Sequence, residues 1–362
     1  MLAAELARSP LLHDSCTLGI ATHGSGVPLA AASHLPQAHL LKGVLGKDIF
    51  GGDAQVAEVW CGRSEATDAT VGTTRCRHNG EVLFATVSAA VPDDGIDALG
   101  AATYAAYRSL LDALHVSGYP HLLRAWNSIP GINVDDGGLE RYRRFNLHRS
   151  KAYSEAKCPT ETGAPAACAL GSFGGPLVVY CLASKAPAEP IENPRQTSAY
   201  RYPQQYGPRA PSFSRAALWR GVSGESDVLF ISGTASIVGH QTQHQGDVVA
   251  QTHETLNNLE SIVTQATRHN AQGISSLLDL RLKVYVRYPA DTSAVRRTLV
   301  ERGVDADAAL YLHADICRAD LLMEIEAFGP ARSLQIRTEM SDERDSRIHQ
   351  SHRPRVGAVG SQ

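Results

Sequence analysis

A segment rich in proline near the middle of the chain limits the possible folds more than any other feature. Between residues 187 and 211 lie six prolines, with three tyrosines among them. Proline lacks a backbone N–H and fixes φ, so this segment can form neither a helix nor a central strand. The 362 residues are enough for two domains of ordinary size. We therefore expect domains at 51–186 and 215–330, joined by a connection over 187–214.

The domain after the connection has the more regular hydrophobic pattern. Residues 280–288 alternate strictly, which is typical of a strand with one buried and one solvated face. Asp247 and Asp291 are placed to begin two helices. The order β-β-α-β-α-β-β predicts an α+β fold, in which helices cover a mostly antiparallel sheet. The predicted strands are 215–222, 228–234, 280–288, 308–313 and 321–328.

The first domain has a weaker pattern, and the two ends of the chain have none. The predicted elements of this domain are strands at 56–60, 82–91 and 177–183 and helices at about 94–118 and 139–153. Residues 1–50 are rich in Gly, Pro, Ala and His, and we expect them to be irregular. Residues 341–362 alternate in charge without apolar periodicity, so we expect a disordered tail.

The composition excludes several classes of protein. The chain has 34 Lys and Arg against 37 Asp and Glu, so it lacks the basic excess of a general nucleic-acid binder. The longest apolar run, 176–183, is far shorter than the roughly 20 residues of a membrane span. The first ten residues have neither the basic nor the apolar region of a signal peptide. Seven scattered cysteines without a CxxC pair indicate free thiols, so we expect a cytoplasmic protein without nucleic-acid or membrane partners.

Motifs for nucleotide, flavin or metal binding are absent from the sequence. There is no GxGxxG after a strand, no GxxxxGK[ST], no HExxH and no GxSxG. His240 and His244 are four residues apart, but the glycines and glutamines around them are typical of a loop, so a metal site there is the minority interpretation. The sequence therefore calls for no metal and no organic cofactor.

Two glutamates stand among apolar residues on the last predicted strand. Glu324 and Glu326 share one face of this strand with Leu322 and Phe328. We expect Glu326 to be solvated. For Glu324 two interpretations are equally open: a solvated side chain, or a carboxyl against apolar neighbours whose raised pKa makes it a general acid.

Three arginines are candidates for binding an anion. Arg149 lies on the inward stripe of the helix predicted at 139–153, where it needs an anionic ligand or a structural ion pair. Arg209 lies within the Pro-rich connection, and Arg215 begins the next strand. Together with nearby tyrosines, these arginines suit a small substrate that carries more than one carboxylate.

Motifs after the connection resemble the RidA/YjgF-like family, whose fold is shared with the small trimeric chorismate mutases. They are LFISGTA at 229–235, GDV at 246–248, LNNL at 256–259, KVYV at 283–286 and EIEA at 324–327. The RidA imine deaminases have an arginine fifteen residues before the first glutamate of the last strand, and Ala309 stands there in this chain. The resemblance therefore implies the fold of 215–330 but not the deaminase activity.

A second set of motifs, spread over most of the chain, is similar to the chorismatases. They are LRAWN at 123–127, GIN at 131–133, GLERY at 138–142 with Arg149, IENP at 191–194, YP at 202–203, YGPR at 206–209, GH at 239–240 and LHADI at 312–316, with EIE at 324–326. Chorismatases release pyruvate from chorismate without a metal or an organic cofactor. The resemblance implies the small molecule chorismate as substrate, and we expect a monomer or a small homo-oligomer.

The resemblance also implies roles for individual residues. Glu324 matches the acid that protonates the enolpyruvyl methylene, and Gly233 and Cys317 match the pair that sets the product. Diol-forming chorismatases have alanine-like residues at both positions, whereas the type with Gly and Cys makes 3-hydroxybenzoate, in some members with 4-hydroxybenzoate. We expect the second type, in which Gly233 leaves room over the substrate ring. The residues expected to bind the substrate are Arg149, Tyr202, Tyr206, Arg209 and Arg215.

Two other functions stay open at this point. The first is a diol-forming chorismatase. The second is a RidA-like protein that binds a metabolite without turnover. For the hydroxybenzoate product we expect use in an aryl polyene pigment or in a quinone ring such as that of ubiquinone.

Overall fold

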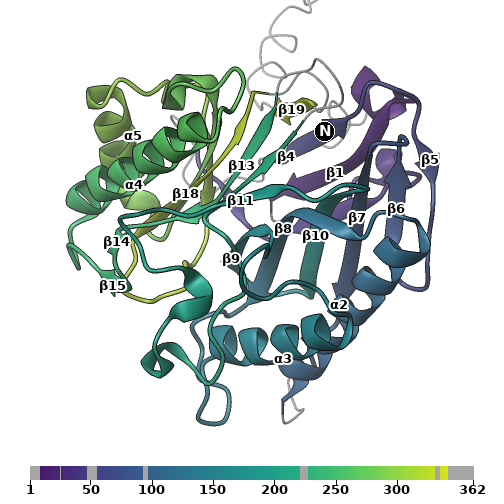
Figure 1. Ribbon diagram of the computed structural model, residues 1–362, viewed down its shortest axis with the longest axis horizontal. Helices are drawn as coiled ribbons and strands as arrows, with labels where there is room; N and C mark the ends of the chain where they lie inside the picture. The colour runs from purple at the N-terminus through teal and green to yellow at the C-terminus, as the bar shows by residue number, and fades with distance from the viewer. Residues whose placement is uncertain are drawn as a thin grey trace, which may run out of the picture.

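The computed structural model describes residues 9–24, 26–46, 55–92, 97–220 and 227–330, and the backbone of 335–340. These residues form a mixed α+β fold with three larger β-sheets and one two-stranded hairpin (Figure 1). The predicted tail at 341–362 lies outside them. No helix within them combines the length and the apolar character that crossing a membrane requires.

A seven-stranded sheet and two helices form one half of the molecule. The sheet has the order β11-β12-β13-β18-β16-β17-β3, and of the neighbouring strands only β16 and β17 are parallel. The side chain of Asp247 accepts a hydrogen bond from the N–H of Ala250 at 3.0 Å and so begins α4, as predicted. Helices α4 and α5 cover the outer face of the sheet (Figure 1). The elements are β3 (Gly43–Val44), β11 (Glu189–Ile191), β12 (Ala216–Trp219), β13 (Val228–Thr234), α4 (Val248–Arg268), β16 (Arg281–Val286), α5 (Thr292–Glu301), β17 (Leu310–His313) and β18 (Met323–Gly329).

A six-stranded sheet and two further helices form the other half. This sheet has the order β5-β6-β7-β10-β8-β9. Helices α2 and α3 pack on its outer face, over a second apolar core. The elements are β5 (Thr67–Asp68), β6 (Arg75–His78), β7 (Val82–Ala89), α2 (Ala98–Val116), β8 (His121–Pro130), α3 (Arg141–Glu155), β9 (Ala166–Ser172) and β10 (Leu177–Ser184).

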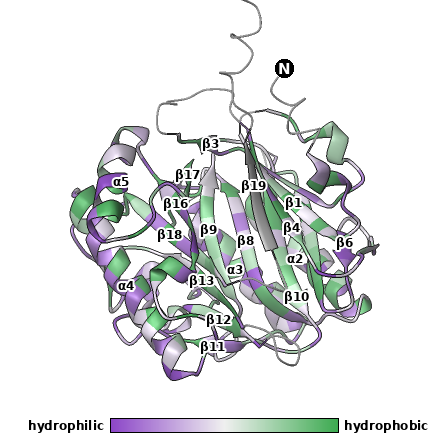
Figure 2. Cartoon of the chain, turned by 90° about the horizontal axis from the view of Figure 1, so that it is seen from above, coloured by the Kyte–Doolittle hydropathy of each residue, from purple (hydrophilic) through white to green (hydrophobic). Residues whose placement is uncertain are grey.

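The inner faces of the two sheets meet in a common core. Along β10, Val179 points toward the helices, whereas Tyr180 points into the core that Phe230 and Phe328 share. The rings of Tyr180 and Trp126 stack with their centroids 4.7 Å apart. Figure 2 shows the strands of the seven-stranded sheet between α4 and α5 on one side and β8 and β9 on the other. Polar side chains on the inner faces therefore lie far from bulk water.

This contact between the sheets overturns the prediction of a solvated face on 280–288. Lys283 and Tyr285 of β16 are both buried. Their face is covered by the second sheet, where Lys283 lies over the ring of Trp126. The carboxylate partners of Lys283 are Glu326 on the neighbouring strand β18 and Glu58 on a strand at Val56–Cys61. The strict alternation of charged and apolar residues predicts the strand correctly. It does not predict that another sheet covers the polar face of this strand.

The prediction that residues 1–50 are irregular is also wrong for the described part of that segment. A four-stranded sheet has the order β19-β4-β1-β2, and β3 joins the edge of the seven-stranded sheet. Polar residues such as Thr22 and His23 are buried within β1, so its hydrophobic pattern is weak although every residue of the strand is buried. Pairing with β4 and β2 forms this strand. The elements are β1 (Thr17–His23), β2 (Gln37–Leu40), β4 (Val56–Cys61) and β19 (Gln335–Met340).

The Pro-rich connection contains one short strand and two helical turns. Pro190 lies in β11, which is an edge strand where a missing N–H is tolerated. The helical turns follow it, and the connection ends at Arg215, directly before β12. The short elements of the described chain are β14 (Ile237–Val238), β15 (Gln241–Thr242), η1 (Pro10–His13), η2 (Ala30–Ala32), η3 (Ala199–Arg201), η4 (Gln204–Tyr206), η5 (Leu277–Asp279) and η6 (Pro289–Asp291).

Candidate functional site

A cavity of about 330 Å³ lies where the connection, β13, β18 and the loop before β18 come together. This volume is within the range of sites that bind small molecules. Six of the eight predicted site residues line it: Tyr202, Tyr206, Arg215, Gly233, Cys317 and Glu324. The other lining residues are Glu140, Tyr142, Arg143, Pro211, Phe213, Ala235, Ile237, Arg318, Ala319 and Asp320.

The carboxyl of Glu324 is buried at this cavity without an ion-pair partner. Its residue is 3% exposed, and among the described residues no hydrogen bond to its side chain is found. Burial, followed by the negative charge of Glu326, raises the pKa of Glu324 to about 8, against the opposing effect of Arg124 and Arg215. At neutral pH the group is therefore a carboxylic acid that can donate a proton.

Gly233 lies in a β-bulge beside this carboxyl. The pairing of β13 with β18 skips there, so that two residues of β13 face one residue of β18. A Cβ atom on Gly233 would overlap a carboxyl oxygen of Glu324 and lie 2.7 Å from its Cδ, with Cβ of Cys168 3.1 Å away. The φ of Gly233 is not in the left-handed region, so glycine is needed here for space alone. The prediction of room over the substrate ring changes accordingly: the Glu324 carboxyl occupies that room.

Cys317 reaches the cavity on a loop that one buried arginine holds in place. Arg287 donates hydrogen bonds to the carbonyl oxygens of Ile316, Arg318 and Leu321 at 3.1, 2.9 and 2.8 Å. These contacts fix the loop on both sides of the Cys317 thiol. Burial, with the nearby Glu324, raises the pKa of Cys317 to about 12, so the side chain is a thiol and not a thiolate at neutral pH.

Two arginines that line the cavity each have a buried nitrogen without a hydrogen-bond partner among the described residues. Arg215 donates to the carbonyl oxygen of Thr197 at 2.7 Å and to the hydroxyl of Tyr202 at 2.8 Å, and its buried Nε has no partner among the described residues. The guanidinium of Arg318 lies 4.0 Å from the ring centroid of Tyr206, and its buried Nη2 is likewise unpartnered in the described chain. A buried N–H without a partner is costly, so both groups are poised to bind an anion.

Arg318 is the main site residue that the sequence did not reveal. It follows Cys317 directly, and that position beside a predicted site residue is the one signal that could have indicated it. Glu140, Tyr142 and Asp320 were missed as well. None of them belongs to a periodic pattern that points toward the cavity.

Two of the predicted arginines do not line the cavity. Arg149 is buried behind it, 2.9 Å from Oδ1 of Asn146 and with its guanidinium 5.0 Å from the ring centroid of Phe145. The inward stripe of α3 faces the core beneath α2 and not the cavity, which explains this position. Arg209 is exposed in the turn after η4.

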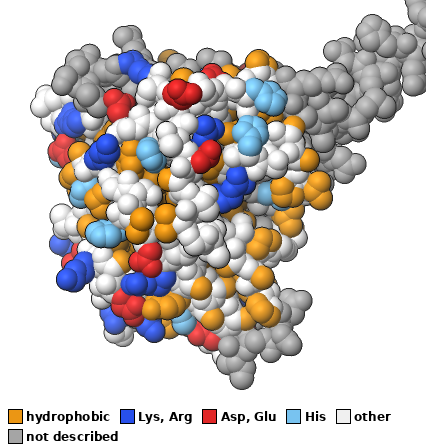
Figure 3. Space-filling view, turned by 90° about the vertical axis from the view of Figure 1, so that its right-hand side faces the viewer, with side chains coloured by type: hydrophobic (Ala, Val, Ile, Leu, Met, Phe, Trp, Pro, Cys, Tyr) orange, Lys and Arg blue, Asp and Glu red, His pale blue; other side chains and the backbone are white. Residues whose placement is uncertain are grey.

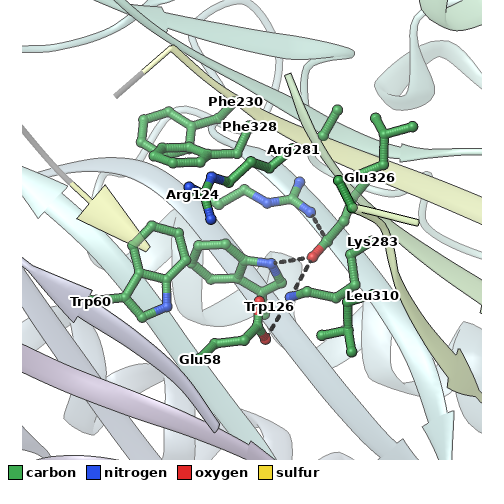
Figure 4. A pocket seen from close by; sticks show the side chains of 13 residues that line it. Glu58, Trp60, Arg124, Trp126, Phe230, Arg281, Lys283, Leu310, Glu326 and Phe328 are labelled. Carbon is green, nitrogen blue, oxygen red and sulfur yellow. Dashed lines mark hydrogen bonds and ion pairs between the residues drawn. The ribbon is translucent and has the colours of Figure 1, made fainter. Parts of the chain in front are cut away.

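Glu326, expected to be solvated, is buried in an ion cluster between the sheets (Figure 4). Its carboxylate forms ion pairs with Arg124 and Lys283. The partners come from β8 and β16, so the strand pattern of β18 alone contained no sign of them.

The described residues include no group of three or more His, Cys, Asp or Glu arranged to hold a metal ion. In the loop singled out for its histidines, Nδ1 of His240 lies 3.2 Å from the hydroxyl of Tyr206, and Nε2 of His244 lies 3.8 Å from a carboxylate oxygen of Glu254. On the face drawn in Figure 3, acidic and basic side chains are intermingled, and no continuous basic stripe runs across it.

Comparisons with known proteins agree on one family. Residues 58–183 match the family described as chorismatase FkbO/Hyg5-like, N-terminal. The chain is 40% identical over 279 residues to a 3-hydroxybenzoate synthase of Streptomyces hygroscopicus, covering 75% of this chain and 80% of that protein. It is 37% identical over 331 residues to a chorismatase of Streptomyces rapamycinicus, covering 89% of this chain and 95% of that protein. A crystal structure of a chorismatase superimposes with a TM-score of 0.78 at 33% identity, covering 88% of this chain and 94% of that one.

Proposed function

The chain belongs to the chorismatase family, and from this premise we propose that it cleaves chorismate to pyruvate and 3-hydroxybenzoate, in part with 4-hydroxybenzoate. One observation carries the proposal: a protonated, buried Glu324 faces a cavity that Arg215 and Arg318 also line. An acid supports protonation of an enol ether, and two cations match a substrate with two carboxylates.

In the proposed reaction Glu324 protonates the methylene carbon of the enolpyruvyl group. The resulting oxocarbenium-like cation is stabilised by the carboxylate that Glu324 has become. The ring hydroxyl of the substrate then displaces the enolpyruvyl oxygen from its ring carbon and gives its proton to the Glu324 carboxylate, which releases pyruvate and leaves an epoxide on the ring. Opening of the epoxide and loss of a ring proton give 3-hydroxybenzoate, so the atoms of chorismate are divided between the products and no water is consumed.

Gly233 and Cys317 are proposed to favour this route over the diol. Gly233 admits the Glu324 carboxyl to a position that a methyl group would occupy. The thiol of Cys317 is a candidate for relaying a proton while the epoxide opens, and its raised pKa restricts that role to the neutral thiol. Tyr202 and Tyr206 are proposed to hold Arg215 and Arg318 against the substrate, through a hydrogen bond and through ring contacts.

The domain organisation is part of the same proposal. We assign 51–186 and 215–330 to two domains joined by the connection over 187–214, with a RidA/YjgF-like fold in the second. The order of strands and helices after Arg215 supports this fold, with the hairpin β14–β15 inserted after β13. Among the described residues none of the seven cysteines forms a disulfide, which supports a reducing compartment such as the cytoplasm.

The test is incubation of the purified protein with chorismate, followed by an assay of pyruvate and chromatography of the aromatic products. Pyruvate together with 3-hydroxybenzoate is expected. Diol as the main product would favour the diol-forming type, and binding without pyruvate would favour a non-catalytic metabolite-binding protein. The variant Gly233→Ala/Cys317→Ala is expected to shift the products toward the diol.

A further inference from the structure

A second carboxyl stands on the same face of β18 as the proposed general acid, two residues away. Glu326 Oε1 lies 2.7 Å from Nζ of Lys283, 2.9 Å from Nε1 of Trp126 and 3.2 Å from the hydroxyl of Tyr285. Its Oε2 accepts a hydrogen bond from Nη2 of Arg124. Figure 4 shows Arg124, Trp126 and Lys283 converging on Glu326 from both sheets. Both oxygens of Glu326 thus have positively charged partners, in contrast to Glu324.

The ion cluster extends beyond Glu326 and alternates in sign. Nζ of Lys283 is also 2.9 Å from Oε2 of Glu58, and Nε2 of His23 lies 2.6 Å from the same oxygen. Burial lowers the pKa of His23 and so favours its neutral form. The two carboxylates are therefore balanced by Arg124 and Lys283. With no net charge in the cluster, its effect on a neighbour depends on which member lies nearest.

Glu326 is the cluster member that dominates at Glu324. Successive residues on one face of a strand are about 6–7 Å apart, close enough for two carboxyls to repel in a medium of low dielectric constant. Burial alone would raise the pKa of Glu326, but Lys283 and Arg124 outweigh it and bring the pKa to about 2. Glu326 is therefore ionised at neutral pH, and two ionised carboxylates so close together are disfavoured.

We propose that Glu326 is a positioning residue for catalysis: its carboxylate, fixed by Arg124 and Lys283, is a permanent negative charge that adds to the effect of burial and keeps the neighbouring Glu324 carboxyl protonated and ready to act as the acid. The proposal rests on the proposed function of Glu324. It also gives the buried ion cluster a purpose beyond stability, because ion pairs at such positions can be replaced by apolar residues at little or no cost in stability.

Other titratable and charged groups face the two carboxyls and have to be considered. Those around Glu324 are Arg124, Cys168, Arg215, Cys317 and Glu326. Those around Glu326 are Lys42, Glu58, Arg124, Cys168, Tyr180, Lys283 and Tyr285. Of these groups, Lys42 is the one whose titration could be confused with that of Glu324, because burial lowers the pKa of Lys42 to about 7.

The first experiment measures kcat/KM for pyruvate release between pH 5.5 and 9.5. In the wild type the activity should fall as Glu324 loses its proton near pH 8. In Glu326→Gln this fall should begin about one pH unit lower or more, with roughly tenfold lower activity than the wild type at pH 9 and a retained plateau at low pH. The double variant Glu326→Gln/Lys283→Met removes one charge of each sign and should shift the profile in the same direction. A profile that stays in place in both variants overturns the proposal.

Two controls separate the proposed role from a structural one. Asp227→Asn removes a buried carboxylate that pairs with the exposed Arg220 and accepts a hydrogen bond from the N–H of Gln272, so it should lower the melting temperature without moving the pH profile. Lys42→Met removes the competing titration, and the fall near pH 8 should persist in it. If Glu326→Gln only lowers the melting temperature, as Asp227→Asn should, Glu326 is purely structural.

The second experiment needs no turnover and no folded variant of Glu326. Carboxyl-carbon NMR of the wild-type protein labelled at glutamate should show one buried carboxyl titrating near pH 8 and another that stays ionised from pH 4 to pH 10. Glu324→Gln should remove the first signal alone. A Glu326 carboxyl that titrates within this range overturns the proposal. Absence of pyruvate release by the wild type would instead count against the proposed function.

Discussion

Glu324 and Glu326 lie two residues apart on one face of β18, and both are buried, yet their surroundings are opposite. Glu324 lines the cavity, and no residue in the described part of the chain forms a hydrogen bond with its carboxyl. Its pKa is raised to about 8. The carboxyl of Glu326 is bound by two cations and by neutral donors, and its pKa is lowered to about 2. The strand gives both residues the same orientation, so the difference comes from the strands that pack against them.

The two glutamates illustrate two kinds of buried charged or polar group in this protein, which differ in whether other strands supply their partners. A buried group whose partners are supplied by other strands holds the two sheets together. A buried group that faces the cavity with unused hydrogen-bonding capacity is reserved for the ligand, because leaving it unpaired is costly. Arg215 belongs to the second kind, together with Glu324, and the half-buried Arg318 lines the same cavity.

The largest effect is expected from Glu324→Gln. Loss of a general acid typically lowers turnover by about 10²–10⁴-fold. The fold should be retained, because the wild-type carboxyl is neutral at pH 7 and glutamine has nearly the same shape. Steady-state pyruvate release and thermal unfolding measure the two effects. Turnover close to that of the wild type would contradict the assignment of Glu324 as the acid.

Lys283→Met tests the other side of the comparison. It leaves Glu58 and Glu326 buried without the cation between them, and breaking a buried ion pair from one side costs roughly 3–5 kcal/mol. Urea denaturation should show this loss in the free energy of unfolding. The matched control is Lys185→Met at an exposed lysine, which should stay within about 0.5 kcal/mol of the wild type. Equal stability of the two variants would show that the cluster does not stabilise the fold.

Arg318→Ala and Arg215→Ala should weaken substrate binding with little effect on melting. Removing one partner of a buried, hydrogen-bonded charge pair costs about 2–5 kcal/mol, so the Kd for chorismate should rise by roughly 30-fold to several thousand-fold. Calorimetric titration in the Glu324→Gln background measures binding without turnover. A variant that melts much earlier and binds normally would make that arginine a structural residue.

The sequence predicts features that depend on interactions between neighbouring residues, and it does not predict features that depend on contacts between distant segments of the chain. The strand at 228–234 and the N-cap at Asp247 depend on local periodicity and on one short-range hydrogen bond, and both lie where predicted. Strand β1 depends on its pairing with β4, and the burial of Glu326 on side chains of β8 and β16. Patterns within a single segment contain no information on such partners.

The candidate site shows the same limit. Glu324 could be singled out as a carboxyl among apolar residues of one strand. Arg318 could not, since its loop has no periodicity and is held by Arg287, which donates to three of the loop's carbonyl oxygens. The prediction that Arg149 points inward is confirmed. The packing of α3 against α2 places this side chain in the core and not at the cavity, and that packing cannot be read from the sequence of α3 alone.

A smaller effect is expected on how stability depends on pH. The folded protein holds the Glu324 proton up to about pH 8, whereas the unfolded chain releases it near 4.5, so the wild type loses stability as pH rises between these values. The expected slope is about 1.4 kcal/mol per pH unit. Glu324→Gln lacks this loss, so its stability relative to the wild type should increase from pH 5 to pH 8 in urea denaturation. Parallel curves would mean that the pKa of Glu324 is not raised.

The smallest effect is expected from Arg209→Ala, which completes the comparison with the cavity arginines. Arg209 has the same charge as Arg318 and lies in the same connection as Tyr206, but its side chain is exposed and does not line the cavity. In water an exposed cation gains little from a nearby anion, so stability should change by less than about 0.5 kcal/mol and the Kd for chorismate by less than about threefold. Measured beside Arg318→Ala in the same titration, it separates the effect of position from that of net charge. A loss of binding as large as that of Arg318→Ala would mean that the connection folds over the substrate and brings Arg209 to it, and the division between buried and exposed arginines would then fail.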